Sequence, residues 1–159
     1  MAQFHLVTVW RIDAPLQQVC TAIFGCMEWP HWWKGVEKVE ELDPGDAHGL
    51  GSLRRFTWKG RLPYRLTFDI RVIRIVPLEV IEGRASGEVE GTGCWYFSQA
   101  GHITVVRYEW NVRTTRLWMN LLALVAKPVF IWNHNQLMQQ GGEGLARLLN
   151  ARLLSCAHG

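Results

Sequence analysis

Three side chains in this sequence, His134, Glu82 and Tyr108, are the candidates for acid–base chemistry. Such chemistry needs a group that faces a cavity and has a pKa near the working pH. His134 falls on the inward face of a predicted helix, where it is either a satisfied core or pocket-rim histidine or a group that faces a ligand. Glu82 shares its strand parity with Arg84. The two side chains therefore either both face solvent or both point inward. If they point inward, they must pair with each other or with the polar head group of a ligand, because an unpaired buried charge is costly.

No motif for a metal, a nucleotide or a catalytic nucleophile accompanies these candidates. The six histidines show neither HExxH nor another metal-ligand spacing. The glycine-rich stretches GLGSL (49–53) and GTGCW (91–95) do not have the GxGxxG pattern that opens a helix, and there is no P-loop. The four cysteines contain no CxxC pair and are expected to behave as small buried hydrophobes. We therefore expect neither a metal nor a cofactor.

The composition is typical of one globular domain, which we expect to span residues 1–159. Apolar residues make up 48% of the chain and charged residues 19%, which argues against disorder. The net charge of +3 comes without the basic stripe of a nucleic-acid-binding protein. We interpret the closest basic pairs, Arg54 with Arg55 and Arg71 with Arg74, as solvated strand faces. The start MAQFHLVTVWRID carries no secretory signal, and unpaired cysteines favour a reducing, cytoplasmic location.

The stretch EWPHWWKG, residues 28–35, holds three of the nine tryptophans. Tryptophan is costly to expose and hard to bury completely, because its ring is large and carries one N–H donor. Pro30 suits the first turn of a short helix and Gly35 suits its end. On a helix of one turn, Trp32 and Trp33 cannot both point inward. These indoles and Trp29 therefore cap or line a cavity, or they are simply core.

Alternating apolar and polar residues predict strands that bury one face. Over residues 64–76 and 102–114, large apolar side chains share one parity and charged side chains the other. About seven such segments occur, with two short helices after the first one. Strands with one buried face favour an antiparallel sheet. The pattern thus predicts an α+β protein with a curved antiparallel sheet.

The chain from Arg116 to about Leu153 is predicted to be one long helix. Apolar residues recur there at steps of three and four, and Pro128 is expected to kink or break the helix. Glycines at 141, 142 and 144 disfavour a helix. Their presence is explained if the helix backbone closely approaches the sheet there, or if space is left beside it. The apolar stretch 117–132 is shorter than the about 20 residues of a membrane span. It either packs on the sheet or contacts a membrane surface.

The sequence resembles the SRPBCC superfamily, which includes START domains and polyketide cyclases. The resemblance rests on WRIDAPLQQV, EWPHWWKGV, GLGSLRRFTWKGRLPY, GEVEGTGCWYF and TVVRYEWNV, and covers about Phe4 to Leu153. It implies the helix-grip fold, in which a curved sheet wraps a long C-terminal helix around a deep apolar cavity. Because one fold hosts many functions, the resemblance reaches function only by analogy.

The cavity implied by this resemblance would be lined by aromatic and aliphatic side chains. Alternation along a strand shows which residues lie on the same face, but it does not show which of the two faces points into the cavity. Tyr64, Tyr108 and His134 would supply the polar contacts that orient a ligand. The expected ligand-binding residues are Trp33, Phe56, Trp58, Tyr64, Phe68, Trp95, Tyr108, Trp110, His134, Leu137 and Met138.

Two functions follow from the sequence and the resemblance together. The first is binding or transport of a hydrophobic small molecule, a lipid or a polyketide-like compound. The alternative is an enzyme of the cyclase or dehydratase kind that acts on a bound aromatic or lipid-like substrate. The sequence leaves open the ligand, catalysis and the oligomeric state.

Overall fold

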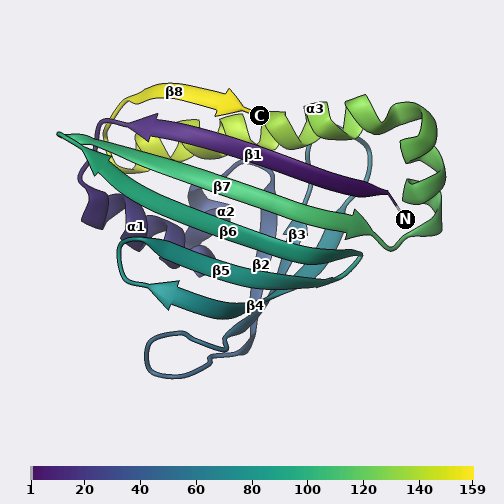
Figure 1. Ribbon diagram of the computed structural model, residues 1–159, viewed down its shortest axis with the longest axis horizontal. Coiled ribbons are helices and arrows are strands. Elements are labelled where there is room, and N and C mark those ends of the chain that lie inside the picture. Colours follow the sequence, from purple (N-terminus) through teal and green to yellow (C-terminus); the bar gives the residue numbers. More distant parts are fainter. Residues whose placement is uncertain (1) are drawn as a thin grey trace.

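Eight strands form one antiparallel sheet in the order β2-β3-β4-β5-β6-β7-β1-β8 in the computed structural model, which describes residues 2–159 (Figure 1). The strands are β1 (Gln3–Ile12), β2 (Val36–Asp43), β3 (Leu53–Trp58), β4 (Leu66–Val76), β5 (Val80–Gly87), β6 (Val89–Ala100), β7 (Ile103–Thr114) and β8 (Leu153–His158). The helical segments are α1 (Leu16–Phe24), the 3-10 turn η1 (Cys26–Glu28), α2 (Trp29–Trp32) and α3 (Leu117–Leu148). The predicted α+β architecture is confirmed.

The parity of the strand residues places aromatic side chains on the concave face. In β7, Trp110 is buried while Arg107 and Arg113, of the other parity, are exposed. Its neighbour β6 runs antiparallel to it, with Trp95 opposite Tyr108 and Gly93 opposite Trp110. A glycine opposite an indole leaves room for the large ring on a crowded face.

The sheet has one strand more than the sequence predicted. The long helix ends at Leu148 rather than near Leu153, and Asn150 turns the chain with a φ of 52°. The last residues then pair antiparallel with β1, so that Cys156 lies opposite Trp10. Short segments carry little periodicity. β8 forms because its backbone pairs with the edge of β1, which would otherwise be unpaired.

Helix α3 is kinked, as Pro128 predicted. Ala126, two residues before this proline, has a non-helical backbone with φ −126° and ψ 19°. Before the kink, Met119 and Ala123 are buried, whereas Leu124 and Val125 are 82% and 83% exposed. The apolar stretch 117–132 therefore packs on the rest of the protein with only part of its surface.

The glycines after the kink allow indole rings to touch the helix backbone. A Cβ added at Gly141 would lie 2.3 Å from Cε2 of Trp33, and one added at Gly144 would lie far inside contact distance of the Trp32 carbonyl oxygen. The expected close approach to the sheet is confirmed at Gly142, where an added Cβ would lie 3.0 Å from Nε1 of Trp10 on β1. At Gly141 and Gly144 the helix is approached by Trp33 and Trp32 instead. In Figure 1, α2 lies near the same end of the molecule as α1, and it contacts α3.

Candidate functional site

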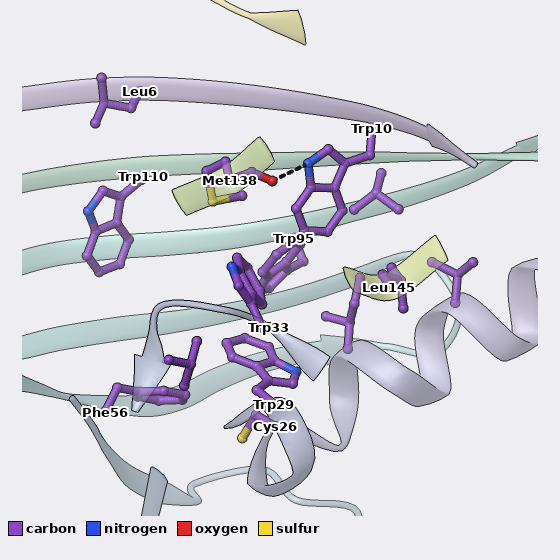
Figure 2. Close-up of a cluster of buried hydrophobic side chains, with 14 of the residues drawn as sticks. Leu6, Trp10, Cys26, Trp29, Trp33, Phe56, Trp95, Trp110, Met138 and Leu145 are labelled. Carbon is purple, nitrogen blue, oxygen red and sulfur yellow. Dashed lines mark hydrogen bonds between the residues drawn. The ribbon is translucent and has the colours of Figure 1, made fainter. Parts of the chain in front are cut away.

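A cluster of indole rings fills the centre of the space between the sheet and α3 (Figure 2). The ring centroids of Trp29 and Trp33 lie 4.9 Å apart, and those of Trp10 and Trp33 lie 5.5 Å apart. The Nε1 atoms of Trp33 and Trp10 donate hydrogen bonds of 2.8 and 3.0 Å to the carbonyls of Leu137 and Met138 on α3. These bonds satisfy the indole N–H groups and fix the two rings as structural core.

Two chambers remain between the sheet and the helices. Chamber 1 has a volume of about 80 Å³ and lies toward α1 and the β3–β6 part of the sheet. It is lined by Ile23, Phe24, Cys26, Trp29, Ser52, Arg54, Phe56, Trp58, Phe68, Ile70, Val72, Ile81, Gly83, Gly93, Trp95 and Tyr108.

Chamber 2 lies toward α3 and has a volume of about 70 Å³. It is lined by Trp58, Gly60, Tyr64, Leu66, Phe68, Tyr108, Trp110, Asn133, His134, Leu137 and Met138. Three aromatic residues, Trp58, Phe68 and Tyr108, border both chambers and so form the partition between them.

Ten of the eleven expected ligand-binding residues border one chamber or both. Phe56 and Trp95 line chamber 1, whereas Tyr64, Trp110, His134, Leu137 and Met138 line chamber 2. The exception is Trp33, which is 1% exposed and packs between Trp10, Trp29 and the helix backbone. We place Trp33 in the packed core rather than in the cavity lining.

Two residues that line chamber 2, His134 and Trp58, each carry a buried nitrogen, Nδ1 and Nε1, that makes no hydrogen bond within residues 2–159. Burial lowers the pKa of His134 to about 4, because a charged imidazole is disfavoured away from water. The ring is therefore neutral at pH 7, and each of its nitrogens is a donor or an acceptor according to the tautomer.

The tyrosines of chamber 2 stay protonated at neutral pH. Burial raises the pKa of Tyr108 and of Tyr64 above the ordinary tyrosine value. The hydroxyl oxygen of Tyr108 lies over Gly93, since a Cβ added there would come within 2.7 Å of it. Both phenols can therefore donate a hydrogen bond or pack against a ligand.

Asn133 is a chamber residue that the sequence did not indicate. Its side chain is buried, and its Oδ1 accepts a hydrogen bond of 3.0 Å from the backbone N–H of Arg61. Gly60 permits this contact, because an added Cβ would lie 2.3 Å from that oxygen. The bond ties the loop between β3 and β4 to the helix at the edge of chamber 2.

Glu82 lies on the outer face of the sheet, away from both chambers. Its neighbours Ile81 and Gly83 line chamber 1, so alternation directs Glu82 outward. There its Oε1 accepts a hydrogen bond of 3.1 Å from Nε of Arg74. Of the three acid–base candidates, only His134 and Tyr108 therefore face the interior.

Arg54 is the residue that the sequence interpretation placed wrongly. Its side chain is only 18% exposed and borders chamber 1, whereas Arg55 lies on the outer face and pairs with Asp69 at 2.8 Å. The sequence did indicate this inward position, because Arg54 has the same strand parity as Phe56 and Trp58. The interpretation relied on the charge of Arg54, which favours a solvent-exposed position.

The thiols give no sign of nucleophilic activation. Burial raises the pKa of Cys20 to about 11 and that of Cys156 to about 11. Burial also raises the pKa of Cys26 and Cys94. A thiol must ionise to attack, so these side chains act as small hydrophobes, as expected.

Comparison with solved structures identifies the architecture. A START superfamily protein from Mycobacterium smegmatis matches with a TM-score of 0.74 at 12% identity, over 92% of this chain and 98% of that chain. The Zhui aromatase/cyclase from Streptomyces sp. R1128 matches with a TM-score of 0.61 at 17% identity, over 92% of this chain and 96% of its own. The protein has the helix-grip fold. Major latex-like protein 151 from Panax ginseng shares this helix-grip fold, with a TM-score of 0.70 at 9% identity over 92% of this chain and 97% of that chain.

These likenesses establish the helix-grip fold and leave function to the site itself. Neither the protein-family models nor the curated protein sequences gave a match to the chain. Within residues 2–159, no helix combines the length and hydropathy that a bilayer crossing requires.

Proposed function

We propose that this helix-grip protein binds a small hydrophobic molecule in the two chambers between its sheet and its helices. The observation that carries the proposal is that two residues lining chamber 2, His134 and Trp58, each hold a buried nitrogen, Nδ1 and Nε1, for which residues 2–159 supply no partner. Buried polar groups are nearly always hydrogen-bonded. A ligand with an apolar body and one oxygen would satisfy one or both nitrogens.

The size of the chambers restricts this ligand. Pockets for drug-sized molecules commonly measure about 300–1,000 Å³, whereas chambers 1 and 2 measure about 80 and 70 Å³. A cavity that holds a single benzene ring measures about 150 Å³, so a ligand of one or two rings or a short chain must displace the partition. Trp58 is the movable part of that partition, because it is half-buried and its N–H has no fixed partner among residues 2–159.

Binding would be driven by removal of apolar surface from water. Each buried CH₂ contributes about 0.8 kcal/mol, and aromatic walls such as Trp110 and Tyr108 would add contacts with a ring. The neutral imidazole of His134 would orient the ligand by accepting a hydrogen bond from a hydroxyl or donating one to a carbonyl. The START and major latex-like proteins that share the fold support a binding function by analogy only.

A paired titration tests this function. We expect the wild-type protein to bind 2-naphthol and, more weakly, naphthalene, as measured by calorimetry and by quenching of tryptophan fluorescence. His134→Leu should weaken 2-naphthol binding about fivefold to tenfold, because it removes one hydrogen bond, and leave naphthalene binding unchanged. His102→Leu, on the exposed turn before β7, is the matched control. A wild-type protein that binds neither compound and carries no hydrophobic molecule in a solvent extract contradicts the proposal.

A second candidate is an enzyme of the cyclase or dehydratase kind. It is favoured by the placement of His134 and Tyr108 in the same chamber, and by the aromatase/cyclase that shares the fold. Neutral His134 would be the base that removes a proton next to a carbonyl, although a weak one, because its pKa of about 4 lies well below the working pH. Tyr108 would donate a hydrogen bond to that carbonyl. Product formation from a linear polyketone, abolished in His134→Leu while ligand binding persists, would establish turnover.

A further inference from the structure

Arg54 is a partly buried cation, 18% exposed, that borders chamber 1 and has few partners. Its Nη1 donates to Sγ of Cys26 at 3.0 Å, and its Nη2 lies 3.4 Å from Oε1 of Glu41. Its Nε is buried and makes no hydrogen bond to any of residues 2–159. A guanidinium has five N–H donors in a fixed fork, so a large part of its bonding capacity is unused.

The neighbouring groups only partly compensate the charge of Arg54. Sulfur is a weak acceptor, and burial raises the pKa of Cys26, so this thiol stays neutral. Glu41 is 41% exposed, which means that solvent screens its interaction with the guanidinium. Burying a cation with so little compensation is costly, and an anion in the chamber would remove that cost.

The rest of chamber 1 is suited to an apolar tail. Phe56, Ile70 and Trp95 surround the space beyond Arg54, and Trp58 closes it toward chamber 2. The Arg54 end lies toward solvent, since both Glu41 and the rim residue Phe24 are exposed. The chamber is thus charged at its outer end and apolar at its inner end.

We propose that chamber 1 binds a small amphiphile with one carboxylate head group, which is held by Arg54, and a short apolar or aromatic tail. The proposal rests on the hydrophobic-ligand function proposed above and specifies the ligand class. Arginine suits this role because its planar fork matches the two oxygens of a carboxylate. A head group with two negative charges is disfavoured, because Glu41 lies beside the guanidinium.

Three compounds separate the head group from the tail. We expect 3-phenylpropanoate to bind the wild-type protein at least about tenfold more tightly than 3-phenylpropan-1-ol, as measured by calorimetry, because a hydrogen bond to a charged group is stronger than a neutral one. Acetate, which has the head group alone, should show no measurable binding. If the alcohol binds as tightly as the acid, the inference is wrong while the hydrophobic-ligand function stands. If neither binds, the inference is wrong, and the titration with 2-naphthol and naphthalene decides separately whether the hydrophobic-ligand function stands.

Substitutions on the two faces of β3 locate the effect. Arg54→Gln should abolish the preference for the acid and leave affinity for the alcohol unchanged, which also shows that the chamber is intact. Arg55→Gln, the neighbour that pairs with Asp69 on the outer face, should keep the preference. An acid preference that survives in Arg54→Gln overturns the inference.

Glu41→Gln tests the inference through an expected gain of affinity rather than a loss. Removing the competing carboxylate should raise affinity for 3-phenylpropanoate severalfold and leave the alcohol unaffected. Glu40→Gln, on the same strand and paired with Lys38 at 3.2 Å, should change neither. If Glu41→Gln weakens binding of the acid, Glu41 does not compete with the head group for Arg54 and the inference is overturned.

Discussion

At the scale of the residue, the polar groups in the interior decide what the chambers can do. His134 and Arg54 are both largely buried, yet they differ in charge: the imidazole is neutral at pH 7, and the guanidinium stays charged. His134 offers a ligand a neutral hydrogen bond, and Arg54 offers an ionic one. Alternation along β3 and β5 determines that Arg54 faces inward and Glu82 outward.

The low pKa of His134 predicts a pH dependence of stability. In the unfolded chain this histidine binds a proton near pH 6.5, whereas in the folded chain its pKa is about 4. Between these values the unfolded state holds more protons, so the free energy of unfolding falls as the pH drops from about 6.5 to about 4. The loss is at most about 3 kcal/mol.

Urea denaturation at pH 7 and at pH 5 measures this effect. His134→Gln should lose less stability on acidification than the wild type does, because the glutamine does not titrate. His31→Gln, at a side chain that is 76% exposed, should behave like the wild type. Equal losses in all three proteins would show that His134 is not held neutral by burial.

At the scale of the element, α3 combines a kinked, partly exposed first half with a second half on which the indoles are packed. The kink follows from Pro128, which cannot donate a hydrogen bond within the helix. The packing follows from glycines that let Trp33 and Trp10 reach backbone carbonyls. The helix thereby anchors the indole cluster and carries His134 on the chamber side.

Gly141→Ala tests this packing. Helix propensity alone predicts that alanine stabilises α3 by about 1 kcal/mol. The added Cβ would instead lie 2.3 Å from the Trp33 ring, so we expect a destabilisation of about 1–3 kcal/mol, typical of an overpacked core. In a Trp33→Phe background the same change should be neutral or stabilising, and thermal unfolding of the four proteins measures the difference. A stabilising effect with Trp33 intact would contradict this packing.

At the scale of the whole molecule, one sheet brings both ends of the described chain together. β1 and β8 are neighbours, and the N–H of Asp13 donates to the carbonyl of Arg152 at 2.9 Å. Without β8, the backbone of β1 would form an open edge. The C-terminal strand therefore protects the side of the sheet against which α3 packs.

Removal of β8 should be costly. We expect a chain that ends at Ala151 to lose at least about 2 kcal/mol of unfolding free energy, because Leu153 leaves the core and β1 loses its partner. A chain that lacks only His158 and Gly159 is the control and should lose far less. Chemical denaturation gives the free energies, and light scattering reports pairing of the exposed β1 edges. Equal stability of the two truncated chains would contradict this account of β8.

The sequence by itself determined which residues share a strand face, where α3 kinks and which aromatic residues belong together, because alternation and proline geometry are local properties. These features were enough to predict the fold class, and, together with the family resemblance, they selected eleven expected ligand-binding residues of which ten border the chambers.

Only the tertiary structure decided which face of each strand is inner, that Trp33 is sealed in the core, that Arg54 lies inside and that β8 completes the sheet. Each of these depends on partners distant in the sequence, such as the Leu137 carbonyl for Trp33 and the edge of β1 for β8. The volume left between the sheet and α3 likewise depends on how the large rings fit together, which no periodicity records.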